Sequence, residues 1–226
     1  MAKRSKRYLE SRKVVDVAKK YELKEAVKLL KSFKRTKFDE SVEVSIKLGI
    51  DPKQSDQLIR GSVSLPKGIG KSLKVIVFAG GEKAEIAKKA GADEVGAEEL
   101  VKKVEGGWAD FDVAIATSDM MKLVGKLGRV LGPQGKMPSP KSGTVTDDIE
   151  KAVKEFKAGK IEYRTDAGGN VHALVGKISF SDSDLEDNIN TFVKLIINSR
   201  PASTKGIFLE KASVSSTMSP GIMIEV

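Results

Sequence analysis

Residues 73–79 read LKVIVFA, an almost unbroken apolar run. A strand inside a parallel sheet is covered on both faces, so apolar side chains occupy successive positions and not alternate ones. The run leads through the turn Ala79-Gly80-Gly81 into residues 82–90, whose apolar spacing is helical. This order predicts a buried parallel strand followed by a helix, which is how an α/β module begins.

The alternation of strand and helix continues as far as residue 158. The next predicted elements are a short strand at 94–95, a helix at 97–104, an apolar strand at 111–116, a helix starting near Ser118, a short strand at 144–146 and a helix capped by Thr146. Asp147 and Asp148 fall in the first turn of the last helix, where acidic side chains favour the helix dipole. Its apolar residues recur on one face, and Gly159 ends it. We therefore expect an α/β module with a largely parallel sheet.

Residues 125–146, GKLGRVLGPQGKMPSPKSGTVT, interrupt this alternation with five glycines, three prolines and four basic residues. Proline removes a backbone donor and glycine admits conformations closed to other residues, so a continuous helix or strand is disfavoured. The apolar residues that can anchor the segment are Leu127, Val130, Leu131 and Met137. We expect an ordered, cationic, irregular segment, and a long surface loop is the alternative on composition alone.

The two ends of the chain show a different pattern. Val42, Val44, Ile46 and Leu48 alternate with polar residues, as in a strand buried on one face. The other predicted elements of the ends are helices at 8–19 and 23–33, a strand at 62–65, strands at 160–165 and 171–180 around a hairpin turn, a helix behind a capping box at Ser183–Glu186, and strands near 206–216 and 222–226. The economical arrangement is an α+β domain built from both termini with the α/β module inserted into it.

Charge is concentrated at the start of the chain. Residues 1–40 hold 14 Lys and Arg against 6 Asp and Glu, so +8 of the net charge of +9 lies there. A basic arm commonly contacts nucleic acid, although a solvated tail is the ordinary reading of an isolated charge run. Within it, Lys34, Arg35, Lys37 and Phe38 combine cations with an aromatic ring, which suits phosphate neutralisation and stacking on an unpaired base.

Several classes of function lack the residues they need. The chain has no cysteine and one histidine, His172, so we expect no disulfide, no metal site and no Ser-His or Cys-His catalysis. Residues Gly68–Ser72 match the last part of a phosphate-binding loop. The first glycine of that motif is absent, and a strand follows where the motif requires a helix. We therefore expect no bound nucleotide or other cofactor. No apolar run approaches the ~20 residues of a membrane span, and the basic start lacks the core of a signal peptide, so a cytoplasmic location is the default.

Long segments of the chain resemble the family of the universal large-subunit ribosomal protein numbered one. They are KLGRVLGP (126–133) followed by GKMPSPKSGTVT (135–146), FDESVEVSIKLGIDP (38–52), SDQLIRGSVSLPKGIGK (55–71), AGADEVGAEEL (90–100), FDVAIAT (111–117), AGKIEYR (158–164), VHALVGKISF (171–180) and STMSPG (216–221). The resemblance is to the bacterial type and covers nearly the whole chain. Lys136 stands where an apolar residue is expected, and Ser219 stands where a glycine is expected.

The resemblance implies a fold of the α/β and α+β classes. A discontinuous α+β domain of residues 1–67 plus 159–226 would bind RNA, and residues 68–158 would form an inserted, Rossmann-like, three-layer α/β domain. The chain would pass between the two domains twice, and these two connections would act as a hinge, at Pro66, Lys67, Gly68, Ala158 and Gly159. Carried over position by position, the RNA contacts would be Glu25, Lys37, Phe38, Ser41, Arg164, Asp166, Ser215, Thr217, Met218, Ser219 and Gly221.

The function that the resemblance implies is structural and non-enzymatic. The protein would bind large-subunit rRNA to form the mobile stalk, assist release of exit-site tRNA, and repress translation of its own operon by binding the mRNA. It would work in the cytoplasm as part of the large ribosomal subunit and be a monomer when free. Two rival interpretations remain at this point: a nucleotide-dependent enzyme within residues 68–158, and a protein–protein scaffold with an incidental basic arm.

Overall fold

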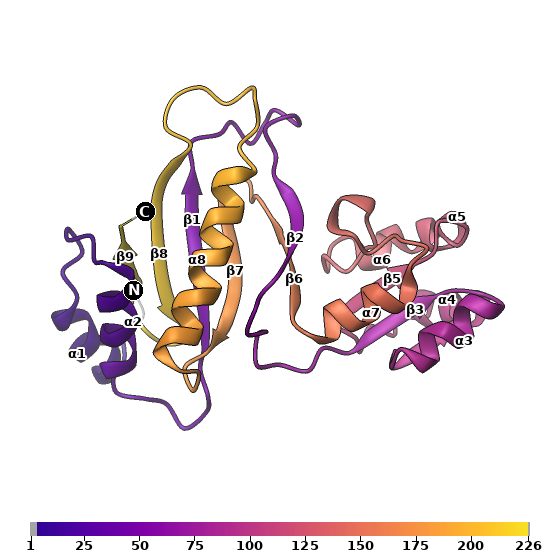
Figure 1. The fold of residues 1–226 in the computed structure, drawn as a ribbon, viewed down its shortest axis with the longest axis horizontal. Coiled ribbons are helices and arrows are strands. Elements are labelled where there is room, and N and C mark those ends of the chain that lie inside the picture. The colour runs from indigo at the N-terminus through magenta and orange to yellow at the C-terminus, as the bar shows by residue number, and fades with distance from the viewer. Residues whose placement is uncertain (1–3, 226) are drawn as a thin grey trace. The chain divides into compact units, whose positions relative to one another are not determined.

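The structure is a computed structural model that describes residues 4–225, and the chain separates into two compact units. Unit 1 comprises the chain up to Gly70 and from Ile161 onward, and unit 2 comprises Lys71–Lys160. Both units mix helices with sheets (Figure 1). The prediction of a mixed α/β protein is therefore confirmed.

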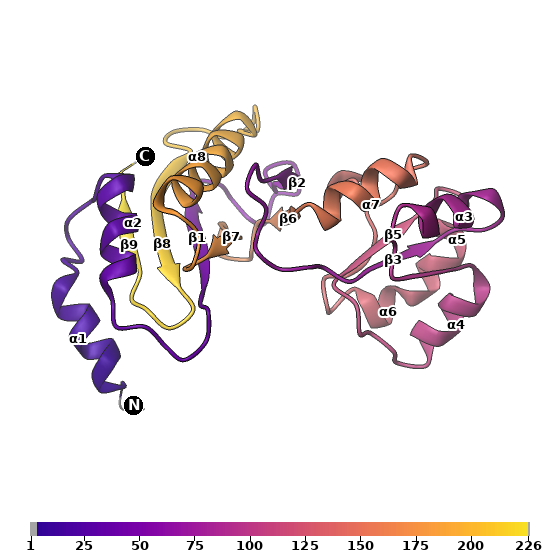
Figure 2. The ribbon, with the colours of Figure 1, turned by 60° about the horizontal axis from the view of Figure 1, so that its bottom comes forward.

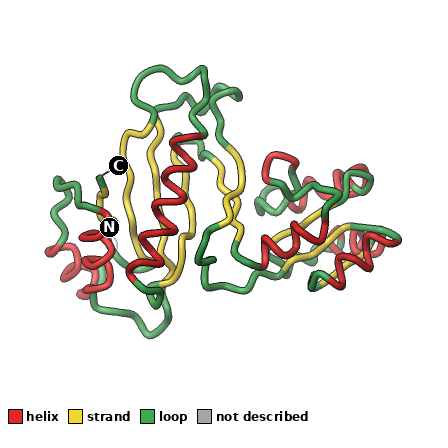
Figure 3. The backbone as a smooth tube through the Cα atoms, in the orientation of Figure 1, coloured by secondary structure: helices red, strands yellow, loops and turns green. Residues whose placement is uncertain are grey.

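Unit 1 is built around an antiparallel sheet with the strand order β7-β1-β8-β9. Its strands are β1 (Ser41–Leu48), β7 (Asn170–Lys177), β8 (Leu209–Ser216) and β9 (Ile222–Ile224). Figure 3 shows the long strands beside the single long helix of the unit, α8 (Asp182–Asn198). The predicted alternation in β1 is confirmed, since its four apolar residues are fully buried and the residues between them are not.

Two helices of unit 1 cover one face of this sheet. Helix α2 (Leu23–Ser32) packs on β8 and β9, α8 packs on β7, and the two helices contact each other (Figure 2). The inward residues of α8 are buried as their spacing predicts: Leu185, Ile189, Phe192, Val193 and Ile196. A shorter helix, α1 (Lys6–Val14), precedes α2 and ends earlier than predicted, at Val14.

Two local predictions in unit 1 need correction. The cap of α8 is Ser181 and not Ser183: the Asp184 N–H donates to Ser181 Oγ (3.1 Å), and Ser181 Oγ–H donates back to the Asp184 carboxylate (2.6 Å). The predicted hairpin turn is present, with the Asp166 N–H donating to the Asn170 carbonyl (2.8 Å). Its first strand, β6 (Lys160–Arg164), nevertheless pairs with β2 (Arg60–Ser64) and not with β7 along its length.

Unit 2 contains a three-stranded parallel sheet with the order β4-β3-β5. The strands are β3 (Val75–Phe78), β4 (Glu94–Gly96) and β5 (Val113–Ala116). Alternate residues of β3 face opposite sides: Ile76 and Phe78 pack toward α4 (Glu98–Glu105), while Val75 and Val77 pack toward α3 (Glu82–Lys89) and α7 (Ile149–Lys157). The apolar run that opens the module is thus buried because helices cover both faces of the sheet.

The glycine-rich segment is more helical than its composition predicts. Helix α5 (Met121–Val124) continues through a 3-10 turn, η1 (Gly125–Leu127), into α6 (Gly128–Leu131), and only a further turn, η2 (Pro140–Ser142), interrupts the irregular remainder. Buried Val124, Leu127 and Leu131 recur at helical spacing on the core of unit 2. Their burial outweighs the entropy that the two intervening glycines lose in a helix.

The last helix of unit 2 begins later than predicted. Its cap is Asp148, whose carboxylate accepts the Lys151 N–H at 3.2 Å, and not Thr146. Thr146 instead accepts the Asp148 N–H through its hydroxyl (3.1 Å). The predicted strand at 144–146 is reduced to a single bridge between Ala116 and Val145.

Candidate nucleic-acid interface

The two ends of the chain meet where β1 begins and β8 ends. These strands are antiparallel, and Val42 lies opposite Ser216. One residue further out, the Ser41 N–H donates to Thr217 Oγ1 (3.0 Å) and the Thr217 N–H donates to the Ser41 carbonyl (3.0 Å). Pairing of the sheet therefore brings the loop that precedes β1 beside the turn that follows β8.

This meeting point carries most of the predicted RNA contacts. We call it the junction face and define it by Lys37, Phe38, Ser41, Ser215, Thr217, Met218, Ser219 and Gly221. Phe38 is 53% exposed and Met218 is 50% exposed, so both side chains are accessible to a partner. The face thus offers apolar side chains, a cation and hydroxyls from segments far apart in the sequence.

A buried carboxylate lies behind the junction face, and the sequence analysis did not identify it. Glu40 is 6% exposed and accepts hydrogen bonds from Ser216 Oγ (2.5 Å), the Met218 N–H (3.2 Å) and the Thr36 N–H (3.3 Å). Arg7 of α1 approaches it at 3.7 Å. Burial raises the pKa of Glu40, but the hydrogen bonds outweigh burial, so its pKa lies below the usual 4.5 and the group is charged.

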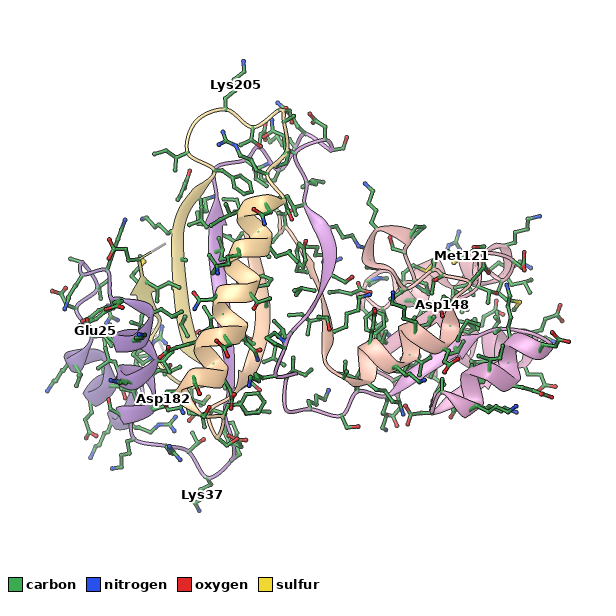
Figure 4. All side chains as sticks on the ribbon, in the orientation of Figure 1. Glu25, Lys37, Met121, Asp148, Asp182 and Lys205 are labelled. Atoms are coloured by element: carbon green, nitrogen blue, oxygen red, sulfur yellow. The ribbon has the colours of Figure 1, made fainter. Side chains whose placement is uncertain are left out.

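Glu25 and the hairpin residues lie apart from the junction face. Glu25 is exposed on α2 beside Lys19, at 3.8 Å, and Figure 4 shows it away from Lys37, which marks the tip of the loop. Arg164 and Asp166 precede β7 at the far end of β1, because Lys47 pairs with Asn170. Six residues of strand rise by about 20 Å, so the predicted contacts form more than one patch.

The hairpin patch is an open hollow of about 570 Å³ lined by residues 162–167 and His172. Hydrogen bonds from the Asn170 backbone and side chain, and from the Gly168 N–H, lower the pKa of Asp166 to about 2. His172 lies 3.6 Å from Asp166 and its Nδ1 lies 3.0 Å from Ser45 Oγ. The turn is therefore held rigidly by an exposed carboxylate.

Polar side chains connect the two patches along the face of the sheet that the helices leave uncovered. Ser45 lies between His172 on β7 and Ser213 on β8, and Glu43 lies opposite Ser215. Hydroxyls at Ser45, Ser213 and Ser215 point away from the buried residues of the same strands, because side chains alternate between faces. This face is mostly polar, although it also carries Leu174 opposite Glu43 and Met223 opposite Ser213.

The first predicted hinge segment is attached to unit 1. Asn188 is fully buried on α8; its side chain accepts the Lys67 N–H (3.1 Å) and donates to the carbonyls of Gly68 (2.9 Å) and Val175 (2.8 Å). Gly70 has φ +69°, and a Cβ there would lie 2.8 Å from the Phe180 ring. The chain is thus fixed to unit 1 as far as Gly70.

The second predicted hinge segment is attached to unit 2. The Ala158 N–H donates to the Lys154 carbonyl (2.9 Å) and the Gly159 N–H to the Phe156 carbonyl (3.2 Å), which closes α7. Lys160 then pairs with Glu155 at 2.7 Å. The two units divide after Gly70 and after Lys160, close to both predicted hinge segments.

The two departures from the family pattern have local partners. The Lys136 ammonium donates to the Ala109 carbonyl (2.8 Å) and lies 5.0 Å from the centre of the Phe111 ring, so its charge is used within unit 2. Ser219 Oγ accepts the Ser216 N–H at 2.9 Å, a bond within the turn that glycine cannot make. Both substitutions therefore act on the protein's own backbone.

Acidic residues of unit 2 form ion pairs and not a catalytic cluster. Asp112 binds Lys71 at 2.7 Å and Asp110 binds Lys74 at 2.7 Å. Within residues 4–225, no group of three His, Cys, Asp or Glu side chains is arranged to hold a metal ion. None of the helices in that range is long and apolar enough to cross a membrane.

A sequence profile of the Ribosomal protein L1p/L10e family matches residues 30–220. The chain belongs to this family. The large ribosomal subunit protein uL1 of Kosmotoga olearia is 54% identical over 225 residues, which cover 100% of this chain and 97% of that protein. The residues matched by the profile include every residue of the junction face except Gly221.

Family membership settles the class of function. The protein is a structural ribosomal protein of the cytoplasm and not an enzyme, so the interpretation of residues 68–158 as a nucleotide-dependent enzyme is wrong. The geometry agrees, because Gly68–Ser72 leads into a strand and not into the helix that a phosphate loop requires.

Proposed function

We propose that this protein binds large-subunit rRNA directly through the junction face and thereby forms part of the mobile stalk of the ribosome. The observation that carries the proposal is the double hydrogen bond between Ser41 and Thr217, which unites the two ends of the chain in one rigid surface. Phe38 offers a ring on which an unpaired base stacks, Met218 offers an apolar contact, and Lys37 neutralises a phosphate. The hydroxyls of Ser215 and Thr217 suit ribose 2′-OH groups, which distinguish RNA from DNA.

A second part of the rRNA lies along the row of hydroxyls toward Arg164 and Asp166. The distance of about 20 Å along β1 corresponds to several nucleotides, so one folded RNA spans both patches. Recognition by shape and by sugar–phosphate contacts fits this mostly polar surface better than readout of a duplex sequence does.

The experiment compares binding of the full chain to large-subunit rRNA fragments and to DNA of the same sequence over a range of salt concentrations. We expect specific binding to one rRNA region, and a fall in log affinity of about 0.7–0.9 per neutralised phosphate for each tenfold rise in salt. Binding that does not depend on salt, or equal affinity for DNA, contradicts the proposal and supports the scaffold interpretation.

Unit 2 extends the function to exit-site tRNA, whose release we propose the stalk assists. Its remaining exposed cations include Arg129 and Lys141, whereas Lys136 is occupied within the unit. We propose that the units are separately folded domains that rotate about the two connections between them, at the predicted hinge residues Pro66–Gly68 and Ala158–Gly159. Energy transfer between two fluorophores, one in each unit, tests this proposal. A broad distribution of distances supports rotation, and a single distance contradicts it.

We further propose that the free protein, a monomer, represses translation of its own operon by binding the mRNA at the junction face. Because both RNAs bind the same face, repression needs no second binding surface. The rRNA binds more tightly than the mRNA, so the protein represses translation only after all rRNA sites are occupied. Competition between the leader mRNA and the rRNA fragment tests the shared face. Simultaneous binding of both RNAs to one protein molecule would exclude it, and sedimentation of the free protein measures its oligomeric state.

A further inference from the structure

The buried carboxylate of Glu40 joins three segments that are distant in the sequence. One oxygen accepts from Ser216 Oγ and from the Met218 N–H, which belong to the turn after β8. The other accepts from the Thr36 N–H, in the loop that carries Phe38, and lies 3.7 Å from Arg7 of α1. Every segment that Glu40 holds leads directly to a residue of the junction face or to the basic helix before it.

Glu40 itself is not placed to contact RNA. The hollow beside it is lined by Arg7, Lys34, Arg35, Ser216 and Met218 among others, and has a volume of only about 10 Å³. One water molecule needs roughly 10–15 Å³, so neither a base nor a phosphate enters.

We propose that Glu40 is a positioning residue for RNA binding, which fixes the Phe38 loop and the Met218 turn in their binding arrangement before RNA arrives. The proposal deepens the proposed function and rests on it. Loops that are ordered beforehand lose less conformational entropy on association, so the benefit appears as affinity without any new contact. The ion pair between Arg7 and Glu40 also attaches α1 to these two segments, and it balances the charge of the buried carboxylate.

Glutamine cannot replace this carboxylate. It has nearly the same shape, but one of its two terminal atoms is an NH₂ group that donates hydrogen bonds. If that group faces the turn, the Met218 N–H loses its acceptor; if it faces the loop, the Thr36 N–H loses its acceptor. Arg7 loses its counter-charge in both orientations, because glutamine is neutral. Glu40→Gln therefore releases one of the two segments in either orientation.

The direction in which RNA affinity changes distinguishes a positioning role of Glu40 from a purely electrostatic one. Removing a negative charge near an RNA-binding face strengthens RNA binding if only long-range charge matters. Glu10 is exposed on α1, so Glu10→Gln removes the same charge without disturbing the buried network. We expect Glu10→Gln to bind rRNA as tightly as the natural protein or more tightly, and Glu40→Gln to bind it roughly ten to a hundred times more weakly.

The experiment measures affinity for the large-subunit rRNA fragment with the full chain and three variants, together with amide NMR spectra of each. In the natural protein, the Met218 amide shift should titrate with Glu40 at a midpoint below 4.5, because hydrogen bonds from Ser216, Thr36 and Met218 outweigh the effect of burial on its pKa. Arg7, Lys34 and Arg35 are the charged groups that line the hollow beside the carboxylate. In Glu40→Gln that titration should vanish while the amide signals of the strands stay in place, which separates a local release from general unfolding.

Ser216→Ala is the third variant, and it tests the positioning role of Glu40 if Glu40→Gln does not fold. It removes one donor to the carboxylate and leaves the other contacts, so we expect a loss of affinity in the same direction but several-fold smaller. Affinity of Glu40→Gln, or of Ser216→Ala in its place, equal to or above that of the natural protein overturns the proposal. Absence of binding by the natural protein overturns the proposed function instead, so the two failures are distinguishable.

Discussion

Ser41 is hydrogen-bonded through both its amide and its carbonyl to Thr217, a residue 176 positions later in the chain. This contact sets the distance between the Phe38 loop and the turn after β8. It follows directly from the antiparallel register of β1 and β8, in which Val42 lies opposite Ser216. The proposed RNA-binding face therefore depends on correct pairing of strands from opposite ends of the protein.

Replacing Phe38 with alanine should weaken binding to the rRNA fragment without changing stability. Loss of one aromatic–base stack costs about 1–3 kcal/mol, or about five- to a hundredfold in affinity. The side chain is mostly exposed, so the midpoint of urea unfolding should stay the same. Ile197→Ala is the matched control, because Ile197 is 46% exposed on α8, which covers the opposite face of the sheet. Equal effects of the two variants on affinity would contradict the assignment.

The Thr217 hydroxyl should matter more than its methyl group. Thr217→Val keeps the shape but leaves the Ser41 N–H without its acceptor, whereas Thr217→Ser keeps the acceptor. We expect about a tenfold loss of rRNA affinity in the valine variant, equivalent to roughly 1.4 kcal/mol, and little change in the serine variant. Isothermal titration calorimetry measures both, and an unaffected valine variant would argue against the role of this hydroxyl.

Two lysines should differ in their effect on salt dependence. Lys37 lies exposed on the junction face, whereas the Lys136 ammonium is bonded to the Ala109 carbonyl in unit 2. We expect Lys37→Met to reduce the slope of log affinity against log salt by about 0.7–0.9, the value for one phosphate contact. Lys136→Met should leave that slope unchanged. A lower slope in the Lys136 variant would show that its charge reaches the RNA.

Asn188 should be among the most sensitive residues of unit 1. Alanine there removes three hydrogen bonds and leaves the Lys67 N–H and the Gly68 carbonyl without their partner. An unsatisfied buried group costs about 1–3 kcal/mol, so we expect Asn188→Ala to lower the free energy of unfolding by about 2–4 kcal/mol. Asn190→Ala, exposed on the same helix, should change it little. A loss below 1 kcal/mol in chemical denaturation would speak against the network.

The hairpin turn should lose stability in acid. A carboxylate whose folded pKa is lowered stabilises the fold above its unfolded pKa, near 3.8, and this contribution disappears as the pH falls through the folded value of about 2. Urea unfolding of the natural protein and of Asp166→Asn should therefore differ above about pH 5 and converge between pH 4 and 2. If the difference in stability between the two proteins stayed constant across this pH range, ionisation of Asp166 would not be its cause.

Elements with a strong local pattern were predictable from the sequence. The alternation in β1, the apolar run of β3 and the apolar face of α8 each follow from burial of that one element, and all three are present. The 125–131 segment was mispredicted because its glycines indicate irregular backbone, while the burial of Leu127 and Leu131 depends on the surrounding core. The cap at Ser181 was missed because a second serine with similar neighbours follows at Ser183.

Features that depend on distant parts of the chain had no local signal. Glu40 reads as an ordinary acidic residue before a strand, because its partners Ser216 and Met218 are 176 and 178 positions away. The contacts of Asn188 with Lys67 and Gly68 are equally non-local. Such polar groups become recognisable only when the sheet pairing that surrounds them is known.

The most direct test of the junction face uses the absence of cysteine from the chain. Lys37→Cys, Ser219→Cys and Lys205→Cys each give a single attachment point for a tethered iron chelate that cleaves nearby RNA; Lys37 and Lys205 mark opposite ends of unit 1 (Figure 4). We predict that the chelates at 37 and 219 cut the bound large-subunit rRNA at overlapping nucleotides and that the chelate at 205 does not cut there. Separate cleavage sites for 37 and 219, or cleavage at the shared site from 205 alone, would contradict a single RNA-binding face made by both ends of the chain.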